Sequence, residues 1–132
     1  MSKKIRSVAR TIIPIGTATT TDTSYNDGGY ARSIIDITPF ENIKAIYFRA
    51  TLTQTASGTY AVWSELTDDG GTLITGCELT ASISQWGQSI QISADVKANV
   101  ATTPTIYRVK YKVAAGGNGG SLTNEIIIDY YV

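Results

Sequence analysis

The side chains that could perform chemistry in this sequence are few and far apart. The chain has no histidine, so the commonest general base and zinc ligand is missing, and its single cysteine, Cys77, cannot build a cysteine-based metal site. A reactive thiol needs a base or basic neighbours, and the residue that follows Cys77 is the acidic Glu78. We therefore predict no catalytic residues, no cofactor and no metal centre, and we expect that the protein is not an enzyme.

Carboxylates are the remaining route to catalysis. A glycosidase of the two-carboxylate type needs acids from different strands that converge across a cleft, roughly 5–9.5 Å apart. The candidates for such a pair are Glu65, Glu78, Glu125 and Asp129. A hydrolase therefore stays as an alternative that depends on two of these acids meeting.

Two polar segments offer weaker signals. Asp22, Asn26 and Asp27 could supply oxygen ligands to calcium, but their spacing does not match an EF-hand loop and these residue types are common in turns. We favour a turn, and the sequence leaves open whether a metal binds in residues 22–27. The run Gly116–Gly120 lacks the spacing of a phosphate-binding loop, so we expect a flexible hairpin tip there.

Aromatic residues are better candidates for a binding role, because the chain has eight Tyr, two Trp and two Phe. Trp63 is predicted to face outward and Trp86 to lie in a loop, so both could stack on sugar rings, with Asp68 and Gln85 as polar neighbours. Tyr and Trp are also enriched at protein interfaces. We favour the interface or packing interpretation, and we keep a glycan contact through Trp63, Trp86 and Asp68 as the alternative.

These side chains must be positioned by β-strands, because no segment shows the sustained apolar spacing and caps of a helix. In Ile46–Leu52 and Tyr107–Val113, apolar and polar residues alternate, which is typical of a sheet with one buried and one solvent-facing side. About eight strands with frequent turn signals predict an all-β, two-sheet antiparallel sandwich of the jelly-roll kind. We expect one domain, residues 1–132, in which residues 1–15 form an N-terminal arm or an edge strand.

The expected strands are Lys4–Ile15, Tyr30–Thr38, Ile43–Gln54, Thr59–Thr67, Thr72–Ile74, Glu78–Ile83, Ser89–Ser93, Thr105–Ala114 and Leu122–Val132. Short connections predict that the third of these pairs with the fourth, and that the last two pair with each other. The first hairpin would set Arg49 opposite Trp63, and the second would set Lys110 opposite Glu125. The last strand is apolar on both faces at its middle, so it is either a covered central strand or an edge that pairs with another copy.

The overall composition permits self-association. Charged residues make up only 17% of the chain, and eleven basic residues balance eleven acidic ones. Copies of such a protein repel each other weakly, and the missing basic excess argues against a nucleic-acid partner. We predict a homo-oligomer. Its expected contact residues are Trp63, Tyr130, Tyr131, Ile12 and Ile13.

Four segments carry a resemblance to known proteins: the strand Ile46–Leu52, the strand Tyr60–Trp63, the turn Asp68–Gly71 and the closing region Tyr107–Val132. Together they resemble small virion proteins of the jelly-roll or β-sandwich kind, which are capsid, decoration and fibre modules of bacterial and archaeal viruses. The resemblance implies a structural protein that contacts itself and other virion proteins. A carbohydrate-binding β-sandwich module is the alternative function.

Nothing in the sequence indicates a membrane partner. No apolar run approaches the roughly 20 residues that span a bilayer, and no continuous apolar segment follows the basic start Met1–Arg6, as a signal peptide would require. We expect the protein in a virion, or in the host cytoplasm before assembly, without export by a signal peptide.

Overall fold

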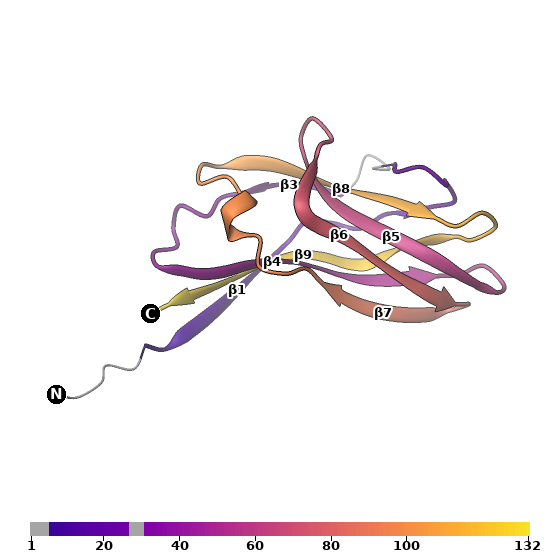
Figure 1. The fold of residues 1–132 in the computed structure, drawn as a ribbon, viewed down its shortest axis with the longest axis horizontal. Coiled ribbons are helices and arrows are strands. Elements are labelled where there is room, and N and C mark those ends of the chain that lie inside the picture. Colours follow the sequence, from indigo (N-terminus) through magenta and orange to yellow (C-terminus); the bar gives the residue numbers. More distant parts are fainter. Residues whose placement is uncertain (1–5, 27–30) are drawn as a thin grey trace.

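Two antiparallel sheets face each other in the computed structural model, which describes residues 6–26 and 31–132 (Figure 1). The five-stranded sheet contains, in spatial order, β1 (Val8–Pro14), β9 (Gly119–Tyr131), β4 (Ile43–Gln54) and β7 (Gly87–Ile92), with the short β2 (Thr19–Thr20) also paired to β9. The four-stranded sheet contains β3 (Arg32–Ile35), β8 (Thr105–Val113), β5 (Thr59–Asp68) and β6 (Leu73–Ser84). A single 3₁₀ turn, η1 (Lys97–Asn99), precedes β8.

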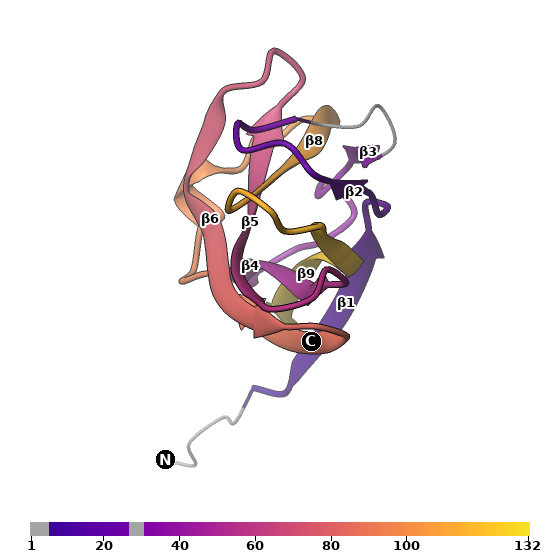
Figure 2. The ribbon, with the colours of Figure 1, turned by 90° about the vertical axis from the view of Figure 1, so that its right-hand side faces the viewer.

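The strand order is that of a jelly roll. Strands near the two ends of the chain pair with each other, and the pairing continues toward the middle of the sequence: β1 with β9, β3 with β8, β4 with β7 and β5 with β6. Successive pairs alternate between the two sheets. Figure 2 shows the result as two layers, with β5 and β8 in one and β4 and β9 in the other. The predicted all-β sandwich of the jelly-roll kind is therefore confirmed.

Both predicted hairpins are wrong, and the nested pairing is the reason. β4 and β5 follow each other in the chain but lie in different sheets, as do β8 and β9. Arg49 therefore lies opposite Glu125, and Lys110 lies opposite Glu65. Short connections here carry the chain from one sheet to the other, so a short loop does not by itself indicate a hairpin.

Several strand boundaries also differ from the prediction. Residues Lys4–Ile5 and Tyr30, with which two expected strands begin, lie outside the described residues; the described parts of those strands are β1 and β3. The two short strands expected around Gly76 are one strand, β6, with an irregular register opposite Glu65 and Thr67. The glycine run does not form a simple hairpin tip, because Gly119 and Gly120 are buried at the start of β9, where a Cβ on Gly120 would overlap Ala18 of the β2 segment.

The core forms between the inward faces of the two sheets, as the alternating patterns predict. β4 contributes the fully buried Ile46, Phe48 and Leu52, and β8 contributes the buried Val109 and Val113. β9 is a central strand between β1 and β4, which confirms the first of its two predicted placements. Ile127 of β9 is buried although its side chain points away from the core, because neighbouring strands flank it.

A polar cluster links the two sheets inside this core. The Asn124 side chain on β9 donates to the hydroxyls of Ser121 and Tyr111 and to the carbonyl of Gly16, and its Oδ1 accepts from Ser64 on β5 at 3.4 Å. Burial raises the pKa of the Tyr111 phenol, so its hydroxyl stays protonated and can serve as a donor. Buried polar groups are costly when unpaired, and this cluster satisfies several of them at once.

Candidate functional site

The outward side of the five-stranded sheet is unusually apolar for a solvent-facing surface. Its register places large apolar side chains on four neighbouring strands: Val8 and Ile12 of β1, Ile127 of β9, Tyr47 of β4, and Ile90 and Ile92 of β7. We call these six residues the apolar outer face. Four of them are 43–69% exposed, namely Val8, Ile12, Ile90 and Ile92. Exposed apolar side chains gathered on one sheet surface commonly mark an interaction site.

Strand β7 makes the largest contribution to this surface, because its apolar side chains point outward and its polar side chains point toward the core. Ile90 and Ile92 are 69% and 50% exposed, whereas Ser89 and Gln91 point toward the interior beside Leu52 and Ala50. An alternating strand in isolation does not reveal which of its two sides faces the core. The sequence pattern therefore identified the strand but missed its two outward isoleucines.

Two ion pairs lie among the residues of the apolar outer face. Arg10 forms a two-pronged contact with Asp129, at 2.7 and 2.9 Å, and Arg49 lies 3.1 Å from Glu125. The bonded guanidinium of Arg10 lowers the pKa of Asp129. Both carboxylates are largely covered, whereas the Arg10 side chain is 49% exposed between Val8 and Ile12.

The predicted interface residues are divided among several environments. Ile12 and Tyr131 lie on the outward side of the five-stranded sheet, with Arg6 5.4 Å from the Tyr131 ring centre. Ile13 packs against the core, as does Tyr130, whose ring is 5.1 Å from that of Phe40. Trp63 lies on the outward side of the other sheet. The structure does not bring these five residues together on one surface, and their role in contacts stays a prediction.

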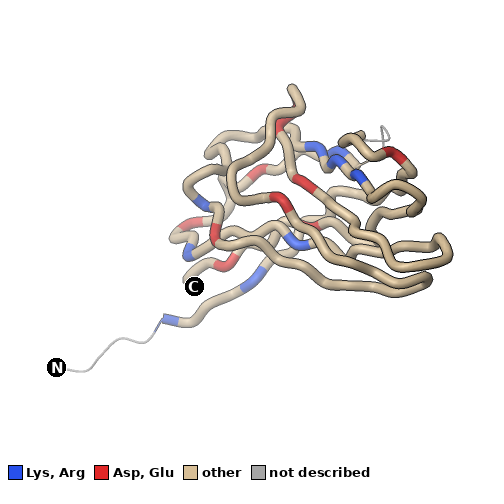
Figure 3. Tube along the Cα trace, turned by 45° about the vertical axis from the view of Figure 1, so that its right-hand side comes forward, with Lys and Arg blue, Asp and Glu red and all other residues tan. Residues whose placement is uncertain are grey.

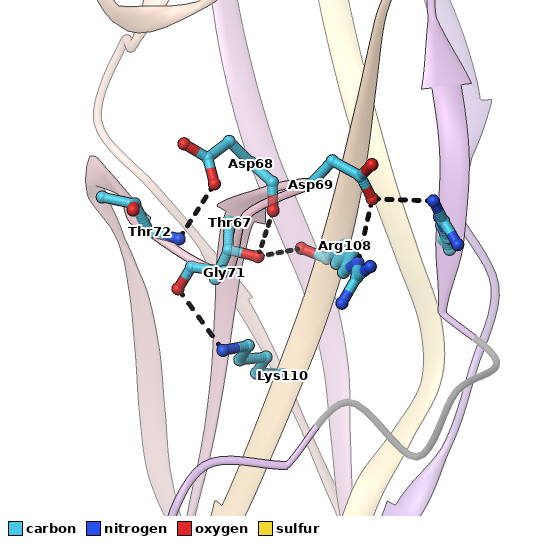
Figure 4. Close-up of polar contacts among 8 residues, drawn as sticks. Thr67, Asp68, Asp69, Gly71, Thr72, Arg108 and Lys110 are labelled. Atoms are coloured by element: carbon cyan, nitrogen blue, oxygen red, sulfur yellow. Dashed lines mark hydrogen bonds and ion pairs between the residues drawn. The ribbon is translucent and has the colours of Figure 1, made fainter.

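The outward side of the four-stranded sheet is charged. The turn after β5 folds over it: Asp69 Oδ1 lies 2.9 Å from Arg32 and 3.0 Å from Arg108, and the Lys110 ammonium donates to the carbonyl of Gly71 (Figure 4). Asp68 accepts from the backbone N–H of Thr72 at 2.9 Å, as a turn-forming residue does. Figure 3 shows acidic segments beside the basic ones, so this surface also carries mixed charge.

Two of the four candidate carboxylates meet on this side. Glu65 of β5 lies directly opposite Glu78 of β6, and Glu78 accepts a 2.8 Å hydrogen bond from the Tyr25 hydroxyl. Burial raises the pKa of Glu65, and the neighbouring Glu78 raises it further against the opposing effect of Lys110 and Lys112. The other two candidates, Glu125 and Asp129, lie on the opposite sheet in ion pairs with arginines.

Two aromatic residues lie beside this carboxylate pair: Tyr25 bonds to Glu78, and Trp63 is two residues from Glu65 on the same side of β5. The Lys112 ammonium lies 4.6 Å from the Tyr25 ring centre and 4.8 Å from that of Trp63, so both rings contact the protein's own cation. Beside them is an open pocket of about 450 Å³. It is lined by Asp22, Thr23, Ser24, Tyr25, Asn26, Gly70, Gly71, Arg108 and Lys110. Neither Glu65 nor Glu78 lines it, so the carboxylate pair does not face this opening.

The expected glycan residues do not form one platform. Trp63 and Asp68 belong to β5, whereas Trp86 lies between β6 and β7. Because Thr59 pairs with Ser84, Trp86 is near the opposite end of β5 from Asp68. Trp86 instead borders a second pocket, of about 270 Å³, at the end of the five-stranded sheet. A glycan contact that combines these three residues is not supported by their placement, and their individual roles stay untested.

The proposed cation loop and the cysteine have ordinary surroundings. The Asn26 side chain donates to the Asp22 carboxylate at 2.5 Å, while Asp27 lies outside the described residues. Within residues 6–26 and 31–132, no group of three or more Cys, Asp or Glu side chains is arranged to hold a metal ion. Cys77 is buried, and burial raises the pKa of its thiol to about 12.

Comparisons with known proteins reveal only distant similarity. No protein-family model matches the sequence, and no curated protein matches it significantly. A structure of Bacillus endospore appendages, described as disulfide-linked pili, is similar over 100% of this chain and 95% of that chain, with 12% identity and a TM-score of 0.38. A structure of the infectious bursal disease virus Gx strain matches 96% of this chain and 30% of that chain, with 8% identity and a TM-score of 0.39.

A third match is the enzymatically active domain of a bacteriophage tailspike protein, with 10% identity and a TM-score of 0.32 over 96% of this chain and 19% of that chain. The chain therefore spans less than a third of the viral and tailspike chains named here. The likeness to virion proteins is weak and concerns the β-sandwich fold. In the part of the chain that the structure describes, no helix has the length and apolar character needed to cross a bilayer.

Proposed function

We propose that this protein is a non-enzymatic structural protein that assembles with copies of itself through the apolar outer face. The observation that carries the proposal is the reversed alternation of β7, which exposes Ile90 and Ile92 while polar residues point inward. A partner that covers these side chains would contribute about 25 cal/mol for each Å² of apolar surface removed from water.

A second copy is the partner that the charges favour. The face carries the pairs Arg10–Asp129 and Arg49–Glu125, in which each positive charge has a negative partner. The whole chain is also neutral, with eleven basic and eleven acidic residues. Two copies can approach without strong repulsion, and little uncompensated charge has to be buried.

Removing the two isoleucines tests the proposal. The double variant Ile90→Thr/Ile92→Thr keeps β-branched residues in β7, so the strand should form while its apolar surface is lost. We expect the wild-type protein to form dimers or larger assemblies, and the variant to shift toward monomers in sedimentation velocity.

Ile34→Thr is the matched control, because Ile34 is 62% exposed on the opposite sheet. Its substitution should leave assembly unchanged. A wild-type protein that stays monomeric at high concentration contradicts the proposal, as does assembly that is equally sensitive to Ile34→Thr.

The finer proposal is that these assemblies belong to a virion, as a capsid-associated, decoration or fibre protein. Its support is the jelly-roll strand order together with the sequence resemblance to small virion proteins. One fold serves many functions, so this step needs its own test. Electron microscopy of concentrated protein should show regular shells, rings or filaments; amorphous aggregates or single molecules would argue against it.

A further inference from the structure

The connection between β6 and β7 holds its largest side chain in an unfavourable backbone conformation. Trp86 has a φ of 63°, in the left-handed region that favours glycine, and its side chain is 73% exposed. Its backbone N–H donates to the carbonyl of Gln54 at 2.8 Å, which fastens the turn to the end of β4. Strained backbone that presents an exposed aromatic ring is typical of a binding site.

A second irregularity lies beside the first. Along β4 and β9, Thr51 pairs with Thr123 and Leu52 pairs with Ser121, so Leu122 is the extra residue of a β-bulge. The bulge leaves Leu122 55% exposed, and its side chain lines the same 270 Å³ pocket as Trp86. Bulges often occur where a strand must redirect a side chain toward a site.

The remaining residues around this pocket are uncharged, and most of the surface that they expose to it is apolar. They are Thr19, Thr53, Gln54, Thr55, Gly87, Gln88 and Ser121. Gln54 and Ser121 are buried and already hydrogen-bonded within the protein, so the polar side chains left for a ligand are those of Thr19, Thr53, Thr55 and Gln88. Their hydroxyl and amide groups can both donate and accept hydrogen bonds, which suits a ligand whose own groups do both. No ionisable side chain lines the pocket, so its chemistry favours an uncharged ligand over an acidic or basic one.

We propose that the pocket between Trp86 and the Leu122 bulge binds one ring of a neutral glycan. The indole would stack on the C–H face of the sugar, and the side chains of Thr19, Thr53, Thr55 and Gln88 would bond its hydroxyls. The volume, about 270 Å³, is near the lower end of small-molecule pockets and suits a single ring. This inference does not depend on assembly through the apolar outer face.

Tryptophan fluorescence gives a direct test. In the background Trp63→Phe, Trp86 is the only tryptophan, so its emission reports on this pocket alone. The probes are cellotriose, maltotriose, mannotriose and triacetylchitotriose, with sialyllactose as a charged comparison, each titrated to about 10 mM so that a millimolar site is nearly saturated. We expect at least one neutral trisaccharide to shift the emission saturably, and sialyllactose to be weaker.

The decisive variant is Trp86→Gly, because glycine adopts this backbone conformation without strain and the fold should be retained. Isothermal titration calorimetry with the active sugar should show a Kd at least about tenfold weaker in Trp86→Gly than in the wild type. Trp86→Phe should keep part of the affinity. Trp63→Phe is the matched control and should bind as the wild type does.

Four outcomes would overturn the proposal. They are no response to any neutral probe, stronger binding of sialyllactose, binding that persists in Trp86→Gly, and, in the Ile90→Thr/Ile92→Thr background, a Trp86 emission that changes with protein concentration in the absence of sugar. The last outcome would assign the pocket to contacts between copies. The double variant Ile90→Thr/Ile92→Thr should lose assembly but retain sugar binding, so the two proposals can fail separately.

Discussion

At the scale of single residues, two side chains, Glu65 and Trp86, lie in energetically unfavourable environments. Glu65 is a buried carboxyl group that lies directly opposite a second acid, Glu78, and beside two lysines. Trp86 combines exposure with left-handed backbone. Each environment has a cost in stability that a substitution should reveal.

The first residue-scale prediction concerns Glu65→Gln. Because the pKa of Glu65 is raised above 4.5 in the folded protein, the folded state favours the protonated acid. Its contribution to stability is therefore fully present below about pH 4.5 and is lost as the pH rises through the folded pKa. We expect the stability of Glu65→Gln relative to the wild type to increase between about pH 4 and pH 7, measured by urea denaturation.

The control for this prediction is Glu41→Gln, because Glu41 is an exposed acid in the connection before β4. Its stability relative to the wild type should change little over the same pH range. A Glu65→Gln variant that loses stability relative to the wild type as the pH rises would contradict the assigned direction.

The second residue-scale prediction concerns the strain at Trp86. A non-glycine residue in left-handed backbone costs roughly 1–2 kcal/mol, and the 73% exposed indole has few contacts to lose. We expect Trp86→Gly to be about 1 kcal/mol more stable than Trp86→Ala, which removes the indole but keeps Cβ. Thermal or urea unfolding of both variants checks this, and equal stability would show that the turn is unstrained.

At the scale of strands, the orientation of each element decides which residues become functional. β4 and β7 both alternate, yet β4 turns its isoleucine and phenylalanine side chains inward while β7 turns Ile90 and Ile92 outward. β9 also places Asn124 in the core, where its side chain bonds to Ser64 and Tyr111 of the other sheet.

The element-scale prediction concerns this link. Asn124→Ala removes a side chain that bonds to Ser121, Tyr111 and the Gly16 carbonyl, and it leaves these buried groups without that partner. We expect a loss of about 1–3 kcal/mol in the free energy of unfolding. Thr123→Ala, on the exposed side of the same strand, should cost far less in the same urea titration. Similar losses for both variants would show that the buried cluster contributes little.

At the scale of the whole molecule, the two outward sheet surfaces differ in chemistry. One carries the apolar outer face with its internal ion pairs, and the other carries the charged groups around Asp69, Lys110 and Glu65. The apolar outer face gathers exposed apolar side chains from β1 and β7 on one side of the molecule, which favours association through that side.

The molecule-scale prediction is that stability depends on protein concentration. Partners that bind only the folded state raise Tm by mass action, so Tm of the wild type should rise with concentration. Tm of Ile90→Thr/Ile92→Thr should vary much less over the same range. Differential scanning calorimetry at several concentrations measures this, and a wild-type Tm that is independent of concentration would count against assembly.

The sequence by itself determined the fold class and most of the strands. Alternation of apolar and polar residues is a local property, so β4, from Ile43 to Gln54, could be predicted with its boundaries. The shortage of catalytic residue types is also visible without a structure. Trp63 and Trp86 could each be recognised as binding candidates, because the ability of an indole ring to stack on a ligand is a property of the residue itself.

Only the tertiary structure decided which strands pair and which side of each strand is covered. Nested pairing joins segments from opposite ends of the chain, such as β1 and β9, and no local pattern records those partners. The same limit hid the outward isoleucines of β7, the separation of Trp63 from Trp86, and the meeting of Glu65 with Glu78. An alternating sequence fits either face of a strand equally well, and only packing against the second sheet decides which face is buried.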